Sequence, residues 1–152
     1  MHLDRHAGCA VSPQLFALLE RLHGHTAVLG LAVLLHPVIT LARGRVLGKG
    51  GRWSAGLAAA LIALPSVAGW LLYPHYRGQI KPTLIAENVT VALAFESKEH
   101  LAFACLCLSL SGVAVALAAP QHARRVALPL LAGGWVCGLV TGGLGIFVAS
   151  LS

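Results

Sequence analysis

The sequence predicts an all-α membrane protein whose four transmembrane helices form an antiparallel bundle, with a candidate interfacial helix between the second and third spans. Of its 152 residues, 57% are hydrophobic and only 11% are charged, whereas a soluble domain carries about 25% charged residues. The mean hydropathy is +0.80. The net charge of +6 comes from short basic runs between apolar stretches. This pattern argues against a soluble domain and against nucleic-acid binding.

Four apolar stretches are long enough to cross a bilayer, which takes about 20 helical residues. They cover approximately residues 22–41, 53–73, 101–119 and 126–151. No linker divides them, so we expect a single integral membrane domain over residues 1–152. Ser12 followed by Pro13 is typical of a helix start, and the first helix is therefore expected to begin well before its span.

Basic residues favour cytoplasmic loops, and two short loops carry them without any acid. The loop over residues 43–52 contains four Lys or Arg residues, and the loop before the fourth span contains Arg124 and Arg125. The acidic residues all fall on the other side of the predicted membrane: Asp4, Glu20, Glu87, Glu96 and Glu99. We expect an N-out, C-out protein of the bacterial inner membrane, with both basic loops in the cytoplasm.

The connection between the second and third spans has two interpretations. Ile85, Val89 and Leu93 recur at helical spacing, which favours an amphipathic helix lying on the membrane surface. Alternatively, the segment runs straight into the third span, because no Gly or Pro falls between Thr83 and Leu110. The sequence leaves both open.

Eight histidines occur in this apolar chain, and ionisable groups inside a membrane are costly enough to need a reason. Three fall in the N-terminal tail or a loop, where water satisfies them: His2, His6 and His122. At 1.5 Å per residue, His25, His75 and His100 form one layer toward the outer side. His36 lies roughly 6 Å inward of the membrane centre, with no histidine at its level.

His23 and His25 lie about 200° apart around one helix, so only one can face the bundle. Both have apolar residues on their stripe, and we favour His25 because Arg21, one turn further out, suits an anionic group of a cofactor. His25 and His100 would then be imidazoles at similar depth on separate helices, as in bis-histidine ligation of a b-type haem. The alternative is that both are interfacial histidines satisfied by water or a polar neighbour.

A non-haem metal site is a further alternative, built from Glu96 and His100 at helical i, i+4 spacing together with His75. Carboxylate and imidazole at that spacing suit Zn, Fe or Cu. The simpler interpretation takes Ser97 as the N-cap of the third span and Glu99 as a carboxylate in its first turn.

Aromatic and basic residues mark the outer end of the second span. Aromatic belts are common at this level, and this is the simpler interpretation. The functional one is a quinone site, because a quinone head group needs polar donors beside an apolar channel and side chains that pass protons. The candidate quinone residues are Tyr73, His75, Tyr76 and Arg77.

The fourth span spaces Gly134, Gly138 and Gly142 four residues apart. This small-xxx-small pattern lets two helix backbones approach closely. Its partner is another span, a second copy or a different subunit.

With HGHTAVLG around His25 and FESKEHLAF around His100, the chain resembles the small four-helix transmembrane b-type cytochromes. The resemblance implies one haem b and a membrane subunit of an electron-transfer complex, with quinone contact and membrane or periplasmic redox subunits as partners. Such a chain conducts electrons more than it catalyses. The lone His36 departs from members with two haems. Rival hypotheses are a cofactor-free accessory subunit in membrane lipid and an outward-facing metal-binding or transport protein.

Overall fold

The computed structural model describes residues 12–119 and 123–151, and all regular structure in this part of the chain is helical. Its elements are α1 Pro13–Ala42, α2 Lys49–His75, η1 Tyr76–Ile80, α3 Lys81–Glu87, α4 Val89–Ala118, η3 Ala123–Ala127 and α5 Leu128–Leu151. Four helices are long and apolar enough to cross a membrane, which confirms the predicted all-α membrane class. Four residues named above lie outside the described part: His2, Asp4, His6 and His122.

The first helix begins where the sequence predicts. Ser12 is its N-cap, and Pro13 opens its first turn. The Ser12 hydroxyl accepts a hydrogen bond from the Leu15 backbone N–H at 3.3 Å, which satisfies one of the free N–H groups of the first turn. The helix therefore starts well before the apolar stretch.

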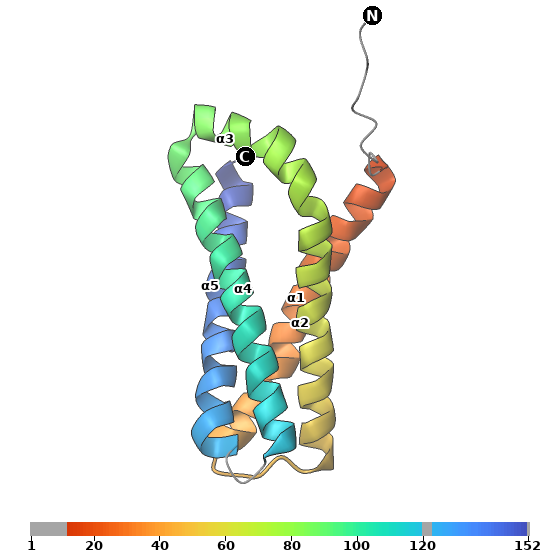
Figure 1. The fold of residues 1–152 in the computed structure, drawn as a ribbon, viewed down its shortest axis with the longest axis vertical. Helices are drawn as coiled ribbons and strands as arrows, with labels where there is room; N and C mark the ends of the chain where they lie inside the picture. Colours follow the sequence, from red (N-terminus) through yellow and green to blue (C-terminus); the bar gives the residue numbers. More distant parts are fainter. Residues whose placement is uncertain (1–11, 120–122, 152) are drawn as a thin grey trace, which may run out of the picture.

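Figure 1 shows the path of the chain. α1 leads to the end of the molecule that holds residues 43–48, here called the inner end, and α2 returns to the opposite, outer end. There η1 and α3 cross over to α4, which leads back to the inner end before α5 returns. α1 packs mainly on α2 and α4 mainly on α5, whereas the backbones of α1 and α4 do not approach each other closely in the described residues.

The connection at the outer end breaks at Asn88. The Asn88 side-chain oxygen accepts hydrogen bonds from the backbone N–H groups of Thr90 at 3.1 Å and Val91 at 3.3 Å, and so caps the start of α4. From Val89 onward one helix runs to Ala118 without interruption. Ser97 lies inside this helix, so its interpretation as an N-cap is wrong.

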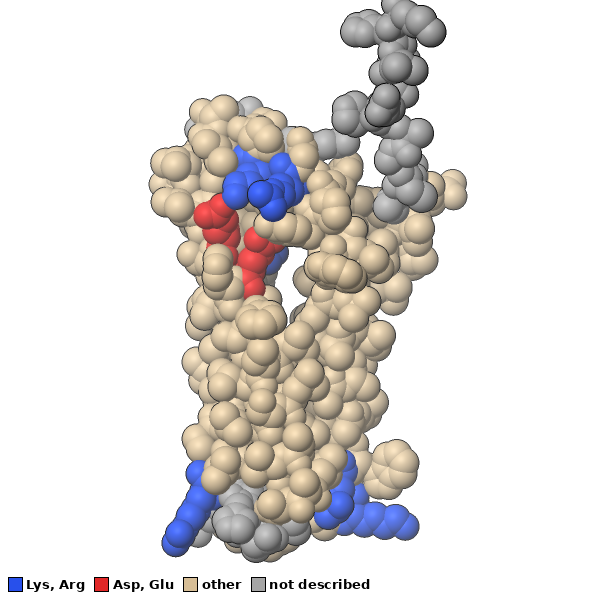
Figure 2. All heavy atoms as spheres, viewed as in Figure 1, with Lys and Arg blue, Asp and Glu red and all other residues tan. Residues whose placement is uncertain are grey.

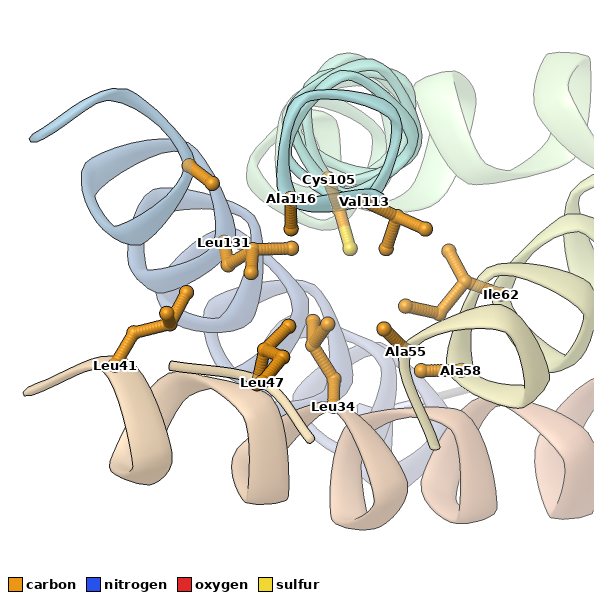
Figure 3. Close-up of a cluster of buried hydrophobic side chains, with 11 residues drawn as sticks. Leu34, Leu41, Leu47, Ala55, Ala58, Ile62, Cys105, Val113, Ala116 and Leu131 are labelled. Atoms are coloured by element: carbon orange, nitrogen blue, oxygen red, sulfur yellow. The ribbon is translucent and has the colours of Figure 1, made fainter. Parts of the chain in front are cut away.

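The hydrophobic core occupies the inner half of the bundle. Side chains from α1, α2, α4 and α5 meet there, as Figure 3 shows. Every member lies in the inner half of its helix or in an adjoining turn: Leu34, Leu41, Leu47, Ala55, Ala58, Ile62, Cys105, Val113, Ala116, Ala127 and Leu131. This end of the molecule is the packed scaffold.

Glycines set the closest helix approaches in this half. A Cβ atom at Gly134 would clash with the Ser109 hydroxyl on α4, and one at Gly138 would clash with Leu31 on α1. A Cβ atom at Gly112 would lie 2.7 Å from the Leu131 Cγ atom. Gly142 has nothing within 4 Å of the same position, so two of the three regularly spaced glycines pack within this chain and the third faces open space.

Candidate functional site

His23, not His25, makes the contact between α1 and α2. Its ring is half-buried beside Gly69, and its Nδ1–H donates to the Pro65 carbonyl oxygen at 2.8 Å. His25 is exposed, and its Nδ1–H donates to the Arg21 carbonyl of its own helix at 2.7 Å. The expected choice of helix face is therefore reversed. The reason is the angular position of each residue around the helix. His23 precedes the closely packed Gly30 by seven residues, or two helical turns, and so lies on the same face of α1.

His100 is exposed as well, and its Nδ1–H donates to the Glu96 carbonyl at 2.8 Å within α4. The buried stripe of α4, which includes Cys105 and Ser109, lies roughly on the opposite side of the helix. With His25 also on an exposed face, one haem between these two imidazoles would require both helices to turn. Their pairing stays a prediction, as does the role of Arg21.

The alternative metal ligands are not assembled. The Glu96 carboxylate forms an ion pair with Lys81, while the His75 ring packs 4.8 Å from the Phe16 ring of α1, centroid to centroid. Within residues 12–119 and 123–151, no group of three or more His, Cys, Asp or Glu side chains is arranged to hold a metal ion. His36 is exposed near the inner end.

Tyr76 is the most deeply placed of the quinone candidates. It is 8% exposed, and its ring stacks on Phe95 of α4 with centroids 3.7 Å apart. The Tyr73 ring lies 6.5 Å away. The Tyr76 hydroxyl is buried without a hydrogen-bond partner among the described residues, and a buried hydroxyl left unpaired costs free energy.

Lys98, which the sequence offers beside Arg21 as a basic residue for a haem propionate, contacts the same aromatic ring. Its ammonium nitrogen lies 4.5 Å from the Phe95 ring centre, and its carbon stem passes Gly145 of α5. Lys98 precedes the buried Cys105 by two turns and thus lies on the buried stripe of α4. In the part of the chain that the structure describes, no acidic side chain forms an ion pair with it.

Two carboxylates complete the polar cluster at the outer end. Glu99 is half-buried on α4, one residue after Lys98. Glu96 is hydrogen-bonded to Lys81 and so ties α3 to α4. This bond raises the pKa of Lys81 above its ordinary value, because the carboxylate stabilises the charged ammonium.

Figure 2 shows an opening between the helices in the outer half of the molecule, with acidic side chains at its edge. The phenol of Tyr76, the ammonium of Lys98 and the carboxylate of Glu99 form no ion pair with the described residues, and such groups can bind a polar head group. We call Tyr76, Lys98 and Glu99 the outer polar site.

No protein-family model matches the chain, and no match was found among curated proteins or solved structures. The function is therefore argued from the outer polar site and its surroundings.

Proposed function

We propose that the chain is a membrane subunit of a quinone-linked electron-transfer complex and that the outer polar site receives the quinone head group. The observation that carries the proposal is the Tyr76 hydroxyl, which is buried next to Phe95 without a hydrogen-bond partner in the described part of the chain. A protein retains such a group at a cost of about 1–3 kcal/mol when its partner is absent. A ligand oxygen is the partner that the site calls for.

The chemistry of the head group matches the three side chains. A quinone presents two carbonyl oxygens, which accept hydrogen bonds from the Tyr76 hydroxyl and the Lys98 ammonium. In this proposal Glu99 exchanges a proton with the head group as it gains or loses electrons. The electrons come from a redox partner, so the chain acts as a conduit within a larger assembly.

The proposed placement in the membrane follows the charges. Four antiparallel spans would hold the basic residues of the inner end in the cytoplasm and α3 at the outer surface as an interfacial segment. In Figure 2 the inner end shows basic side chains alone, whereas the outer end shows both signs. The asymmetry supports an N-out, C-out orientation in a bacterial inner membrane.

Haem b is the second candidate cofactor of the same function. His23, His25 and His100 each donate Nδ1–H to a backbone carbonyl, which leaves Nε2 unprotonated and is the state of a metal-ligating histidine. His25 and His100 remain our proposed ligands, with Arg21 for a propionate. His23, which faces α2, is the alternative haem ligand on α1 in place of His25.

A reduced-minus-oxidised visible spectrum of the purified protein tests the haem proposal. We expect a sharp α-band that is lost in His25→Ala or His100→Ala and retained in His36→Ala. Loss with His23→Ala and not with His25→Ala would move the ligand to the inward face. A colourless protein that still co-purifies with membrane partners would favour the cofactor-free accessory subunit.

The quinone proposal is tested by titrating the purified chain in nanodiscs with a short-chain ubiquinone. Tyr76→Phe removes only the unpaired hydroxyl, so we expect binding to weaken about tenfold, the value of one hydrogen bond of about 1.4 kcal/mol. Because no hydrogen bond within the protein is lost, thermal stability should not fall.

The matched control is Ser66→Ala on the same helix, whose hydroxyl donates to the Ile62 carbonyl at 3.0 Å. This variant also loses one hydroxyl and should bind the ubiquinone like the original chain. Equal affinity of Tyr76→Phe and the original chain would overturn the proposed site, as would equal weakening in both variants.

A further inference from the structure

A second cavity lies at the inner end, where α1 passes into α2. It has a volume of about 340 Å³. Its wall is formed by the last turns of α1, the turn that follows and the first turn of α2. The lining residues that matter are His36, Ile39, Arg43, Arg45 and Gly48.

Three cationic or imidazole groups around this cavity have no partner among the residues that the structure describes. The guanidinium groups of Arg43 and Arg45 and the ring of His36 form no hydrogen bond or ion pair with the described residues. The acidic side chains described in α1 and α4, Glu20, Glu96 and Glu99, all lie in the outer parts of their helices. None of these three carboxylates therefore compensates the positive charge of the cavity.

The first turn of α2 adds hydrogen-bond donors. Gly48 is its N-cap and supplies no side-chain cap bond, so backbone N–H groups at this helix start remain free. A Cβ atom at Gly48 would meet nothing within 4 Å, which leaves the cavity open beside them. Guanidinium groups together with free N–H groups at a helix start suit a phosphate oxygen.

The surroundings of the cavity are apolar. Ile39 forms one wall and is 39% exposed, and Val46 and Trp53 nearby in the chain are 71% and 73% exposed. An exposed tryptophan beside basic residues is typical of a membrane–water boundary. The ligand is thus expected to combine a phosphate with hydrocarbon chains.

We propose that this cavity binds the head group of an anionic phospholipid, with Arg43 and Arg45 on the phosphate and Ile39 against the acyl chains. Basic pockets between transmembrane helices on the cytoplasmic side bind such head groups. The net negative charge of the lipid neutralises the unpaired guanidinium groups, which a zwitterionic lipid does only in part.

The test is native mass spectrometry of the full chain in detergent, titrated with phosphatidylglycerol and phosphatidylcholine of the same acyl chains. We expect retention of phosphatidylglycerol and at least tenfold weaker retention in R43Q/R45Q. The control R21Q/R77Q removes the same charge from the outer end and should bind like the original chain. If both double variants lost phosphatidylglycerol to a similar extent, the net charge of the protein would explain the binding, and the proposed site would be overturned.

A second variant keeps all charges. Gly48→Leu places a side chain in the open part of the cavity, and we expect it to lose the preference for phosphatidylglycerol while the protein folds and inserts normally. Full retention of the lipid by Gly48→Leu would overturn the proposal. So would complete displacement of the lipid by millimolar inorganic phosphate, because the ligand would then be free phosphate.

Discussion

In the inner half of the bundle, eleven buried residues fill the space between the helices, and glycines bring the backbones into contact. In the outer half, the helices surround an opening edged by charged side chains, and the Tyr76 hydroxyl has no hydrogen-bond partner among residues 12–119 and 123–151. The polar interactions between helices also differ. At the inner end, the Arg52 guanidinium donates a hydrogen bond to the Leu117 carbonyl. At the outer end, the Lys81–Glu96 ion pair joins α3 to α4. One half supplies rigidity, which leaves the other free to carry polar groups at some cost in stability.

The largest expected effect concerns which end faces which side of the membrane. In a chain without its native cysteines, Gly78→Cys at the outer end should react completely with an impermeant maleimide added outside cells, and Gly48→Cys at the inner end should not react. The physical reason is that loops rich in Lys and Arg stay on the cytoplasmic side of the membrane, where the impermeant reagent does not reach them. The opposite labelling pattern would exchange the two sides in every functional proposal made above.

Next in size is the packing of the inner half. Gly134→Leu forces a side chain into Ser109 and the α4 backbone, and we expect it to destabilise the bundle by about 3 kcal/mol or more. Thermal unfolding in detergent, followed by thiol exposure, measures the loss. Gly142→Leu is the control and should be nearly neutral, since nothing lies near that position. Strong destabilisation by Gly142→Leu would show that this face is covered by a partner.

A smaller effect, of opposite sign, is expected in the outer half. Lys98→Met removes a half-buried ammonium that forms no ion pair with the described residues and keeps the apolar stem. The bundle should therefore gain about 1 kcal/mol in stability and bind the short-chain ubiquinone more weakly. Thermal unfolding and the quinone titration measure the two effects. Lys49→Met, at an exposed position of α2, should change neither. A destabilised Lys98→Met would mean that Lys98 supports the fold.

The smallest effect is the pH dependence of the Lys81–Glu96 link. The pKa of Lys81 is raised in the folded protein. The stability that the Lys81–Glu96 ion pair gives to the folded state is therefore fully present below the ordinary lysine pKa of about 10.4, and it is lost as the pH rises through the raised pKa. A spin label at position 85 of α3 should stay restrained from about pH 7 to 10 and become mobile above that range. In Glu96→Gln the label should be mobile throughout, and pH-independent mobility in the unsubstituted chain would contradict the role of this link.

Much of the fold could be predicted because hydropathy and helix caps act locally. The four spans follow from their length and composition, and Ser12–Pro13 marks the start of α1. The break at Asn88 escaped notice because no Gly or Pro accompanies it. The usable sign in the sequence was Asn88 itself. Asn is a favoured N-cap residue, because its side-chain oxygen can accept hydrogen bonds from the backbone N–H groups two and three residues later.

The candidate site was harder to predict because it depends on which helix face turns inward. Both stripes of α1 are apolar, so periodicity could not choose between His23 and His25. The buried position of Lys98 could not be predicted since the third span was expected to start near residue 101. Once α4 begins at Val89, the spacing Lys98, Cys105, Ser109, Gly112 defines the buried stripe and puts the lysine on it.

The pairing of neighbouring helices bears on how the chain is made. α1 packs mainly on α2, and α4 mainly on α5, so each hairpin can close as soon as its own two helices have left the ribosome and entered the bilayer. The joining of the two hairpins is then a late, separate event of biogenesis. Since the opening of the outer half lies between the hairpins, a ligand can be enclosed at that step instead of being threaded into a finished bundle.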